Sequence, residues 1–299
     1  MLLYKNKTKE VKMKSKLKKT LAMLLCILTL TILPITQLGA AAADTDTLSY
    51  LPNVTVYLGG NQVLNGDAKI IDDVTYVSLR SFCDLIGGCE LTWDARTRTA
   101  TVRSGTTEII STTGDYYIYA NERCLYTVTP IRIIDNRMWV PIRPIAKALG
   151  VEVEWDGTRR AVILTKTGKQ LEHANTFYDN DELYWLSRII SAESKGEPLK
   201  GQIAVGNVVL NRVRHKSYPN TIYGVIFDRK NGTQFSPVSF GTIYNKPSAS
   251  AIIAAKICLE GYSISNDILF FMNPRIATSN WISQNRPFAF RIGNHDFYY

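Results

Sequence analysis

Residues 180–194 read Asn-Asp-Glu-Leu-Tyr-Trp-Leu-Ser-Arg-Ile-Ile-Ser-Ala-Glu-Ser, and this stretch predicts a helix with one apolar face. Asn180 and the two acidic residues after it are typical of a helix start, because side-chain oxygens and negative charge suit the free N–H groups of a first turn. The apolar positions at helical spacing are Leu183, Leu186, Ile189 and Ile190. Glu193 continues this series at the same spacing, so its carboxylate is expected on the apolar face.

A carboxylate in that position has a chemical consequence. It loses hydration, which favours the protonated form and raises its pKa. A general acid that must hold a proton at neutral pH needs such a shift, so Glu193 is the candidate catalytic residue. The same periodicity also permits another interpretation, in which the helix frays at its end and Glu193 points into solvent.

A second helix is predicted from Pro198 to about Arg214, since proline suits the first turn of a helix. Asn207 and Asn211 lie four residues apart on an otherwise apolar flank of it. A buried amide without partners costs free energy, so both side chains must bond to something specific. Two roles remain open for these amides: they tie down a loop, or they orient the acid and its substrate.

Polar side chains alternate with aromatic rings through the rest of the second half. The further candidate binding residues are Gln234, Phe235, Ser236, Phe271, Asn273, Trp281, Asn294 and His295. This composition is typical of a carbohydrate groove, in which rings stack on sugar faces and amides bond hydroxyl groups. Each aromatic residue, taken singly, is equally compatible with a place in the core.

The first half contains an internal repeat with an offset of roughly sixty residues. One copy begins Tyr-Val-Ser-Leu-Arg-Ser-Phe at 76–82, and the other begins Trp-Val-Pro-Ile-Arg-Pro-Ile at 139–145. Each copy predicts a strand, a short helix that a glycine stops, and a hairpin that turns at Asp94 or Asp156. The residue before that aspartate is a tryptophan in both copies, and we expect it to be an inward-facing anchor of a small sheet.

The N-terminus carries the pattern of a secretory signal peptide. Residues 5–19 hold eight lysines and one glutamate, an apolar run follows, and a block of alanines ends at Ala43. This order predicts export and cleavage near Ala43, with a retained membrane anchor as the alternative. Of the formal net charge of +9, about +2 remains after residue 43. The basic balance is therefore a targeting feature and does not indicate nucleic-acid binding.

The remaining histidines are His173, His215 and His295, which are far apart and lack ligand spacing. No Cys-x-x-Cys occurs either. The sequence therefore predicts no metal site and no cofactor.

Six motifs of the second half, in order, resemble the spore cortex-lytic cell-wall hydrolase family. They are Ala192–Pro198, Gly201–Val205, Leu210–Val213, Tyr218–Ile222, Gln234–Val238 and Ile292–Tyr298. The resemblance covers nearly all of residues 182–299 and implies a lysozyme-like, goose-type fold with lytic transglycosylase activity and Glu193 as the catalytic glutamate. Ser194 and Lys195 depart from the Ala and Arg expected of typical members. The repeat resembles the copper amine oxidase N-terminal domain, an extracytoplasmic module of Gram-positive bacteria, over about Tyr50 to Lys166.

Together these features predict an α+β protein of two domains. Residues 1–43 are expected to be the signal peptide, 44–168 a β-rich repeat module with short helices, and 169–181 a linker. Residues 182–299 are expected to form a mainly helical catalytic domain with a small sheet.

The functional hypothesis is a secreted wall enzyme that cleaves the bond between N-acetylmuramic acid and N-acetylglucosamine, in cortex lysis or wall remodelling. Glu193 would donate a proton to the bridging oxygen and then accept one from the muramyl C6 hydroxyl, leaving a 1,6-anhydro end. This scheme needs one carboxylate, whereas ordinary glycosidases pair two. Glu197, the nearest second carboxylate, is expected to cap or turn the chain.

Two other functions stay open, an N-acetylmuramoyl-L-alanine amidase and a non-catalytic wall-binding protein. The expected partner is the glycan strand of peptidoglycan. The repeat module is a possible second contact with the wall or with a protein, and its Trp and Arg residues are either glycan ligands or structural groups.

Overall fold

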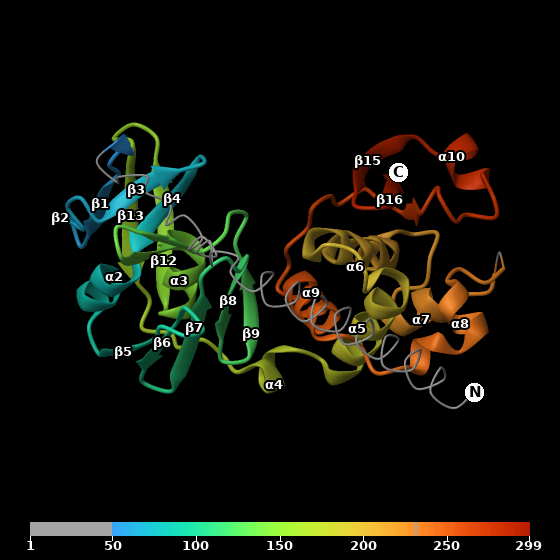
Figure 1. The fold of residues 1–299 in the computed structure, drawn as a ribbon, viewed down its shortest axis with the longest axis horizontal. Coiled ribbons are helices and arrows are strands. Elements are labelled where there is room, and N and C mark those ends of the chain that lie inside the picture. Colours follow the sequence, from blue (N-terminus) through green and yellow to red (C-terminus); the bar gives the residue numbers. More distant parts are fainter. Residues whose placement is uncertain (1–49, 231) are drawn as a thin grey trace, which may run out of the picture. The chain divides into compact units, whose positions relative to one another are not determined.

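The computed structural model describes residues 50–230 and 232–299, so the predicted signal peptide lies outside the described residues. All the described residues belong to one compact unit. Within it a β-rich domain is followed by a domain of helices and a small sheet (Figure 1). Among the residues described, none of the helices combines the length and apolarity that crossing a membrane requires.

Three sheets make up the described part of the first domain, with strand orders β12-β13-β1-β2, β10-β11-β4-β3 and β5-β6-β7-β8-β9. The strands are β1 (Thr55–Leu58), β2 (Asn61–Val63), β3 (Ala68–Ile71), β4 (Val74–Ser78), β5 (Cys89–Asp94), β6 (Thr99–Ser104), β7 (Thr107–Thr112), β8 (Tyr117–Ala120), β9 (Arg123–Tyr126), β10 (Arg132–Ile134), β11 (Arg137–Pro141), β12 (Val151–Asp156) and β13 (Ala161–Lys166). The helices are α2 (Leu79–Ile86), α3 (Ile142–Ala148) and α4 (Ala174–Phe177).

The two copies of the repeat are related by an approximate twofold axis. Strands β4 and β11 pair antiparallel, and Val77 lies opposite Val140, its own counterpart in the repeat. Tyr76 and Trp139, the next pair of counterparts, are both fully buried. They pack with Ile71 and Ile134 in one apolar cluster. Each copy therefore supplies an equal share of the centre of the domain.

The predicted helix stops and hairpin turns of the repeat are confirmed. Gly87 follows α2 with a φ of 79°, a conformation that favours glycine. The Asp94 carboxylate accepts from the backbone N–H of Arg96 at 2.8 Å, and Asp156 accepts from the N–H of Thr158 at 2.9 Å. These bonds close the two hairpin turns locally.

The prediction of inward tryptophans is wrong. Trp93 and Trp155 are 44% and 47% exposed. Each occupies the inner side of its strand by alternation, but it lies near the hairpin tip, past partly buried Leu91 or Val153, where the core no longer covers it. Tyr76 and Trp139 are the aromatic anchors instead.

The described part of the second domain packs its helices together and carries one three-stranded sheet, β14-β16-β15. Its elements are α5 (Asn180–Ser194), α6 (Leu199–Arg214), α7 (Ile222–Phe227), α8 (Ser236–Phe240), η2 (Thr242–Tyr244), α9 (Ala249–Leu259), β14 (Phe270–Met272), α10 (Trp281–Asn285), β15 (Phe288–Ile292) and β16 (His295–Tyr298). Gly206 of α6 lets three helices approach closely, since a Cβ there would lie 2.7 Å from Cys258 Sγ of α9 and 2.9 Å from Ile190 Cδ1 of α5.

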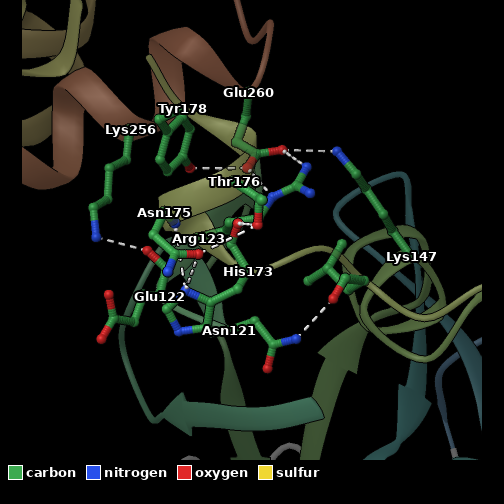
Figure 2. A network of polar contacts seen from close by, with 11 residues as sticks. Asn121, Glu122, Arg123, Lys147, His173, Asn175, Thr176, Tyr178, Lys256 and Glu260 are labelled. Carbon is green, nitrogen blue, oxygen red and sulfur yellow. Dashed lines mark hydrogen bonds and ion pairs between the residues drawn. The ribbon is translucent and has the colours of Figure 1, made fainter. Parts of the chain in front are cut away.

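A buried ion pair joins the two domains (Figure 2). Arg123 of β9 donates to both carboxylate oxygens of Glu260, at 2.6 and 2.8 Å, and each side chain is only 4% exposed. Tyr178 and Lys147 donate to the same carboxylate at 2.9 and 2.8 Å. The Phe177 ring centre lies 3.3 Å from the guanidinium carbon of Arg123. Every oxygen of this buried carboxylate thus has a partner, which offsets its desolvation.

Candidate active site

Helix α5 presents Glu193 in its last turn. The helix is capped by Asp179, one residue before the predicted start, whose carboxylate accepts from the N–H groups of Asp181 and Glu182 at 2.8 and 3.0 Å. Its predicted apolar face is real, because Leu186, Ile189 and Ile190 are fully buried. The helix remains regular through Ser194, whose hydroxyl donates to the carbonyl of Ile190 at 2.7 Å.

The Glu193 side chain is half-buried and makes no hydrogen bond with any described residue. Burial raises its pKa from an ordinary 4.5 to about 7, and the Arg212 guanidinium opposes this rise. At neutral pH both the acid and the carboxylate are therefore populated. A group with that balance can donate a proton and take one back.

Arg212 of α6 supplies a buried cation beside Glu193. Its side chain is 5% exposed, and its Nε donates to the carbonyl of Leu269 at 2.8 Å. Its Nη1 has no partner among the described residues. Burial lowers the pKa of Arg212, and the negative charge of Glu193 is among the influences that oppose this. The Nη1 amino group of Arg212 is thus left to donate to a group that enters the site.

Sequence reasoning did not single out Arg212. A usable signal was present: Arg212 follows Val208 by four residues and Val209 by three, which puts a cation on the apolar face of a helix. In that position a guanidinium needs a specific reason to be buried. Its guanidinium carbon lies 5.1 Å from the ring centres of Tyr218 and Phe235 and 5.5 Å from that of Phe270, which supply a cation–π environment.

Three of the predicted binding residues meet in one aromatic cluster. The ring of Phe271 lies 6.5 Å from that of Phe235 and 5.4 Å from that of His295. Phe235 and His295 are 2% and 6% exposed, so they pack in the core, while Phe271 is half-buried. Burial lowers the pKa of His295, with Glu197 and Asp296 opposing the shift, and its Nδ1 has no partner within the described chain.

Asn207 and Asn211 serve the loop after α9 rather than an open site. Asn207 donates to the carbonyl of Tyr262 at 3.1 Å and accepts from the N–H of Ile264 at 2.9 Å. Asn211 donates to the carbonyls of Ser265 and Ile268 at 3.0 and 2.8 Å. Both are buried, so the loop accounts for the bonds that their amides make, and a role in binding substrate stays a prediction.

Gln234, Ser236, Asn273 and Trp281 lie on turns or in short helices. Gln234 donates to the carbonyl of Gly232 at 3.1 Å, and Asn273 accepts from the N–H of Arg275 at 3.0 Å. Ser236 is exposed at the first position of α8. Trp281 is 50% exposed and contacts Phe270, with ring centres 6.4 Å apart.

Glu197, the nearest second carboxylate, holds the turn between β15 and β16. It accepts from the backbone N–H and the side-chain amide of Asn294 at 2.9 and 3.0 Å. Burial acts to raise the pKa of Glu197, but the two bonds from Asn294 outweigh it and the pKa lies below its ordinary value. A Cβ on Gly293 would lie 2.0 Å from Glu197 Oε2, so glycine is required at that turn. Asn294, a predicted binding residue, donates both of these bonds and so belongs to the same turn.

Family comparisons divide the chain at the same place as the fold. Residues 196–298 match the cell wall hydrolase family, and residues 57–172 match the copper amine oxidase N-terminal domain. A spore cortex-lytic enzyme of Bacillus cereus is 38% identical over 120 residues, which is 40% of this chain and 45% of that protein. The spore cortex-lytic enzyme of Bacillus subtilis is 37% identical over 120 residues, which is 40% of this chain and 38% of that protein. The chain thus spans less than half the length of these two relatives.

Two solved structures of catalytic domains are similar in sequence to part of this chain. The catalytic domain of the germination-specific lytic transglycosylase SleB from Bacillus anthracis is 38% identical, and the match covers 41% of this chain and 97% of that one, with a TM-score of 0.38. For the catalytic domain of the Bacillus cereus SleB protein the identity is also 38%, over 41% of this chain and 92% of that one, with a TM-score of 0.37. Residues 196–298 of this chain are thus similar to the cell wall hydrolase family, and residues 57–172 are similar to the copper amine oxidase N-terminal domain.

Proposed function

We propose that this protein is an extracytoplasmic lytic transglycosylase that cleaves the bond between N-acetylmuramic acid and N-acetylglucosamine in peptidoglycan, with Glu193 as its catalytic residue. The observation that carries the proposal is the half-buried Glu193 carboxyl, whose pKa is raised to about 7. The 38% identity to a chain described as a germination-specific lytic transglycosylase supports the reaction class. Spore cortex is the substrate we favour, because the Bacillus relatives are described as spore cortex-lytic enzymes.

The reaction needs two proton transfers, one from Glu193 and one to it. Protonated Glu193 gives its proton to the bridging oxygen as the bond from that oxygen to muramyl C1 breaks. The Glu193 carboxylate then takes the proton of the muramyl C6 hydroxyl as O6 bonds to C1. The products are a 1,6-anhydro-muramyl end and a free hydroxyl on the departing sugar, and no water is consumed.

A pKa near 7 suits both halves of this cycle. A carboxyl with a much lower pKa would rarely carry the first proton, and one with a much higher pKa would be a slow acid and leave little driving force. Arg212 keeps the pKa from rising further, because its charge favours the carboxylate. We assign Arg212 as a positioning residue that sets the proton affinity of Glu193.

Only one carboxylate is needed, and Glu197 is already engaged. Its two bonds to Asn294 and its lowered pKa leave it a poor proton donor and a turn-forming group. Hydrolysis by a pair of carboxylates would require a second free one across the sugar ring. A lysozyme-like, goose-type arrangement of the helices forms part of the proposal.

Muropeptide analysis tests the proposal. Purified cortex and vegetative peptidoglycan are digested with wild-type protein, Glu193→Gln and Glu182→Gln, and the products are separated and weighed by mass spectrometry. Glu182 is the matched control, because it is an exposed acid in the first turn of the same helix. Wild type and Glu182→Gln should release anhydro-muropeptides, and Glu193→Gln should release none. Free reducing ends would indicate hydrolysis instead, and released stem peptides would indicate an amidase.

A further inference from the structure

Two cavities in the first domain are related by the internal repeat. The larger has a volume of about 520 Å³ and is lined by Trp155 and Arg143, among others. The smaller has a volume of about 280 Å³ and is lined by Trp93 and Arg80, the counterparts of those residues in the other copy. Their residues lie in β3 to β13, so both cavities are separate from the Glu193 site.

Both copies of the repeat contribute to each cavity. The larger cavity takes Trp155 from the second copy and Asp73 from the β3–β4 turn of the first. The smaller takes Trp93 from the first copy and Asn136, the counterpart of Asp73, from the second. This exchange follows from the antiparallel pairing of β4 with β11 around Val77 and Val140. The twofold axis that builds the domain therefore builds the cavities in a matched pair.

The walls combine an aromatic face with hydrogen-bonding groups. Trp155 and Trp93 are nearly half exposed, at 47% and 44%. Arg143 donates from Nη1 to the carbonyl of Val153 at 3.0 Å, which holds its guanidinium against the same hairpin as Trp155. Thr127 also lines the larger cavity; its side chain is 2% exposed, and its hydroxyl has no partner in the described part of the chain. A hydroxyl of this kind in a cavity wall is available to bond a group of a ligand.

The charges of the larger cavity are mixed, since Asp73 and Glu154 line it together with Arg143. Such a wall disfavours a polyanion, which two carboxylates would repel. It suits a ligand with many hydroxyl and amide groups and an occasional carboxylate, because each wall group then finds a complementary one. The exposed tryptophan supplies a flat apolar face, as one side of a pyranose ring requires.

We propose that the two cavities bind an amino-sugar polymer that carries short peptides, the glycan strand of peptidoglycan, with one segment of a strand at each cavity. Two related sites on one domain, each with an exposed tryptophan and an arginine, fit a ligand that repeats, because the second contact forms at high effective concentration. The choice of polymer rests on the proposed function of Glu193. The existence of a paired saccharide site rests on the cavities alone.

Binding to sacculi tests this proposal in the whole chain, with Glu193→Gln present throughout so that the ligand stays intact. Sacculi are stripped of protein and of anionic polymers, and bound protein is measured at increasing sacculus concentration. Trp93→Ala and Trp155→Ala should each weaken binding about tenfold, and the double variant should weaken it further. Tyr50→Ala is the control, because Tyr50 is 88% exposed and lines neither cavity.

The double variant overturns the proposal if it binds stripped sacculi as tightly as the Glu193→Gln parent. Binding that requires the anionic polymers or a wall protein overturns it as well. Trp155→Phe keeps an aromatic face and should keep most of the binding, which separates loss of the ring from loss of folding. If the wild-type protein cleaves nothing but binding still depends on the two tryptophans, the proposed catalysis is refuted. The proposal of a paired binding site is then still supported.

Discussion

Glu193 of α5 and Arg212 of α6 act on each other's proton affinity from neighbouring helices. Burial raises the pKa of Glu193, and the guanidinium of Arg212 limits that rise. The two helices hold this pair on the shared core that Ile190 and Gly206 bring together. The acid is therefore tuned by one apolar environment and one buried cation.

Removing the charge of Arg212 should shift the pH dependence of cleavage. In Arg212→Met nothing offsets burial, so the pKa of Glu193 rises and the alkaline limb of kcat/KM moves to higher pH. Arg212→Lys keeps the charge and should keep the limb near that of wild type, although it loses the hydrogen bond from Nε to the carbonyl of Leu269. Both profiles come from initial rates on solubilised peptidoglycan. If the alkaline limb of Arg212→Met stays where it is in wild type, Arg212 does not influence the pKa of Glu193.

Glu193→Gln should stabilise the fold at high pH and leave it unchanged at low pH. The folded pKa of Glu193 lies above its unfolded value, so wild type loses stability as pH rises from about 4.5 to about 7. A pKa shift of this size lowers the free energy of unfolding by at most about 3 kcal/mol, and the partial exposure of Glu193 reduces this loss to roughly 2 kcal/mol. Urea unfolding of wild type and Glu193→Gln at pH 4 and pH 8 measures this difference in stability. Equal free energies of unfolding at pH 8 would show that Glu193 is solvated.

Breaking the buried pair of Arg123 and Glu260 should destabilise the fold far more than removing Lys147, its exposed neighbour. Glu260→Gln leaves Arg123 buried without a counter-charge, and we expect it to lower the free energy of unfolding by about 3 kcal/mol. Lys147→Met removes a partner whose side chain is 49% exposed, and it should cost less than about 1 kcal/mol. Urea unfolding compares the two. Similar small losses would mean that the pair is solvated.

Two tryptophans of the repeat should differ sharply on truncation. Trp139→Ala removes a fully buried ring at the twofold axis and should cost about 3–5 kcal/mol. Trp155→Ala removes a ring that is 47% exposed and should cost under about 1 kcal/mol while weakening binding to sacculi. Thermal unfolding of each variant checks the contrast. A large loss in Trp155→Ala would return that ring to a structural role.

Periodicity predicted which side of an element a residue faces, but not how far the core extends beneath it. For Glu193 that was enough, because α5 stays regular to Ser194 and packs along its whole apolar face. For Trp93 and Trp155 it was not, because their hairpins continue past the core. The repeat itself could be read from the sequence, whereas the antiparallel register that sets Val77 opposite Val140 is a tertiary pairing.

The amides show a second limit. Their spacing placed Asn207 and Asn211 on a buried flank, and the need for partners followed from that. The partners lie 54 to 57 residues later, in a loop whose path no local pattern encodes. The domain bounds and the binding roles of all the predicted binding residues stay predictions.

Site-specific titration of the Glu193 carboxyl tests the central claim most directly. With ¹³C-labelled glutamate, the signal absent from Glu193→Gln identifies the group, and its chemical shift is followed from pH 3 to 10. A midpoint near 7 is the predicted result, with a higher midpoint in Arg212→Met. A midpoint near 4.5 would mean that the carboxyl is hydrated and carries no proton to donate at neutral pH.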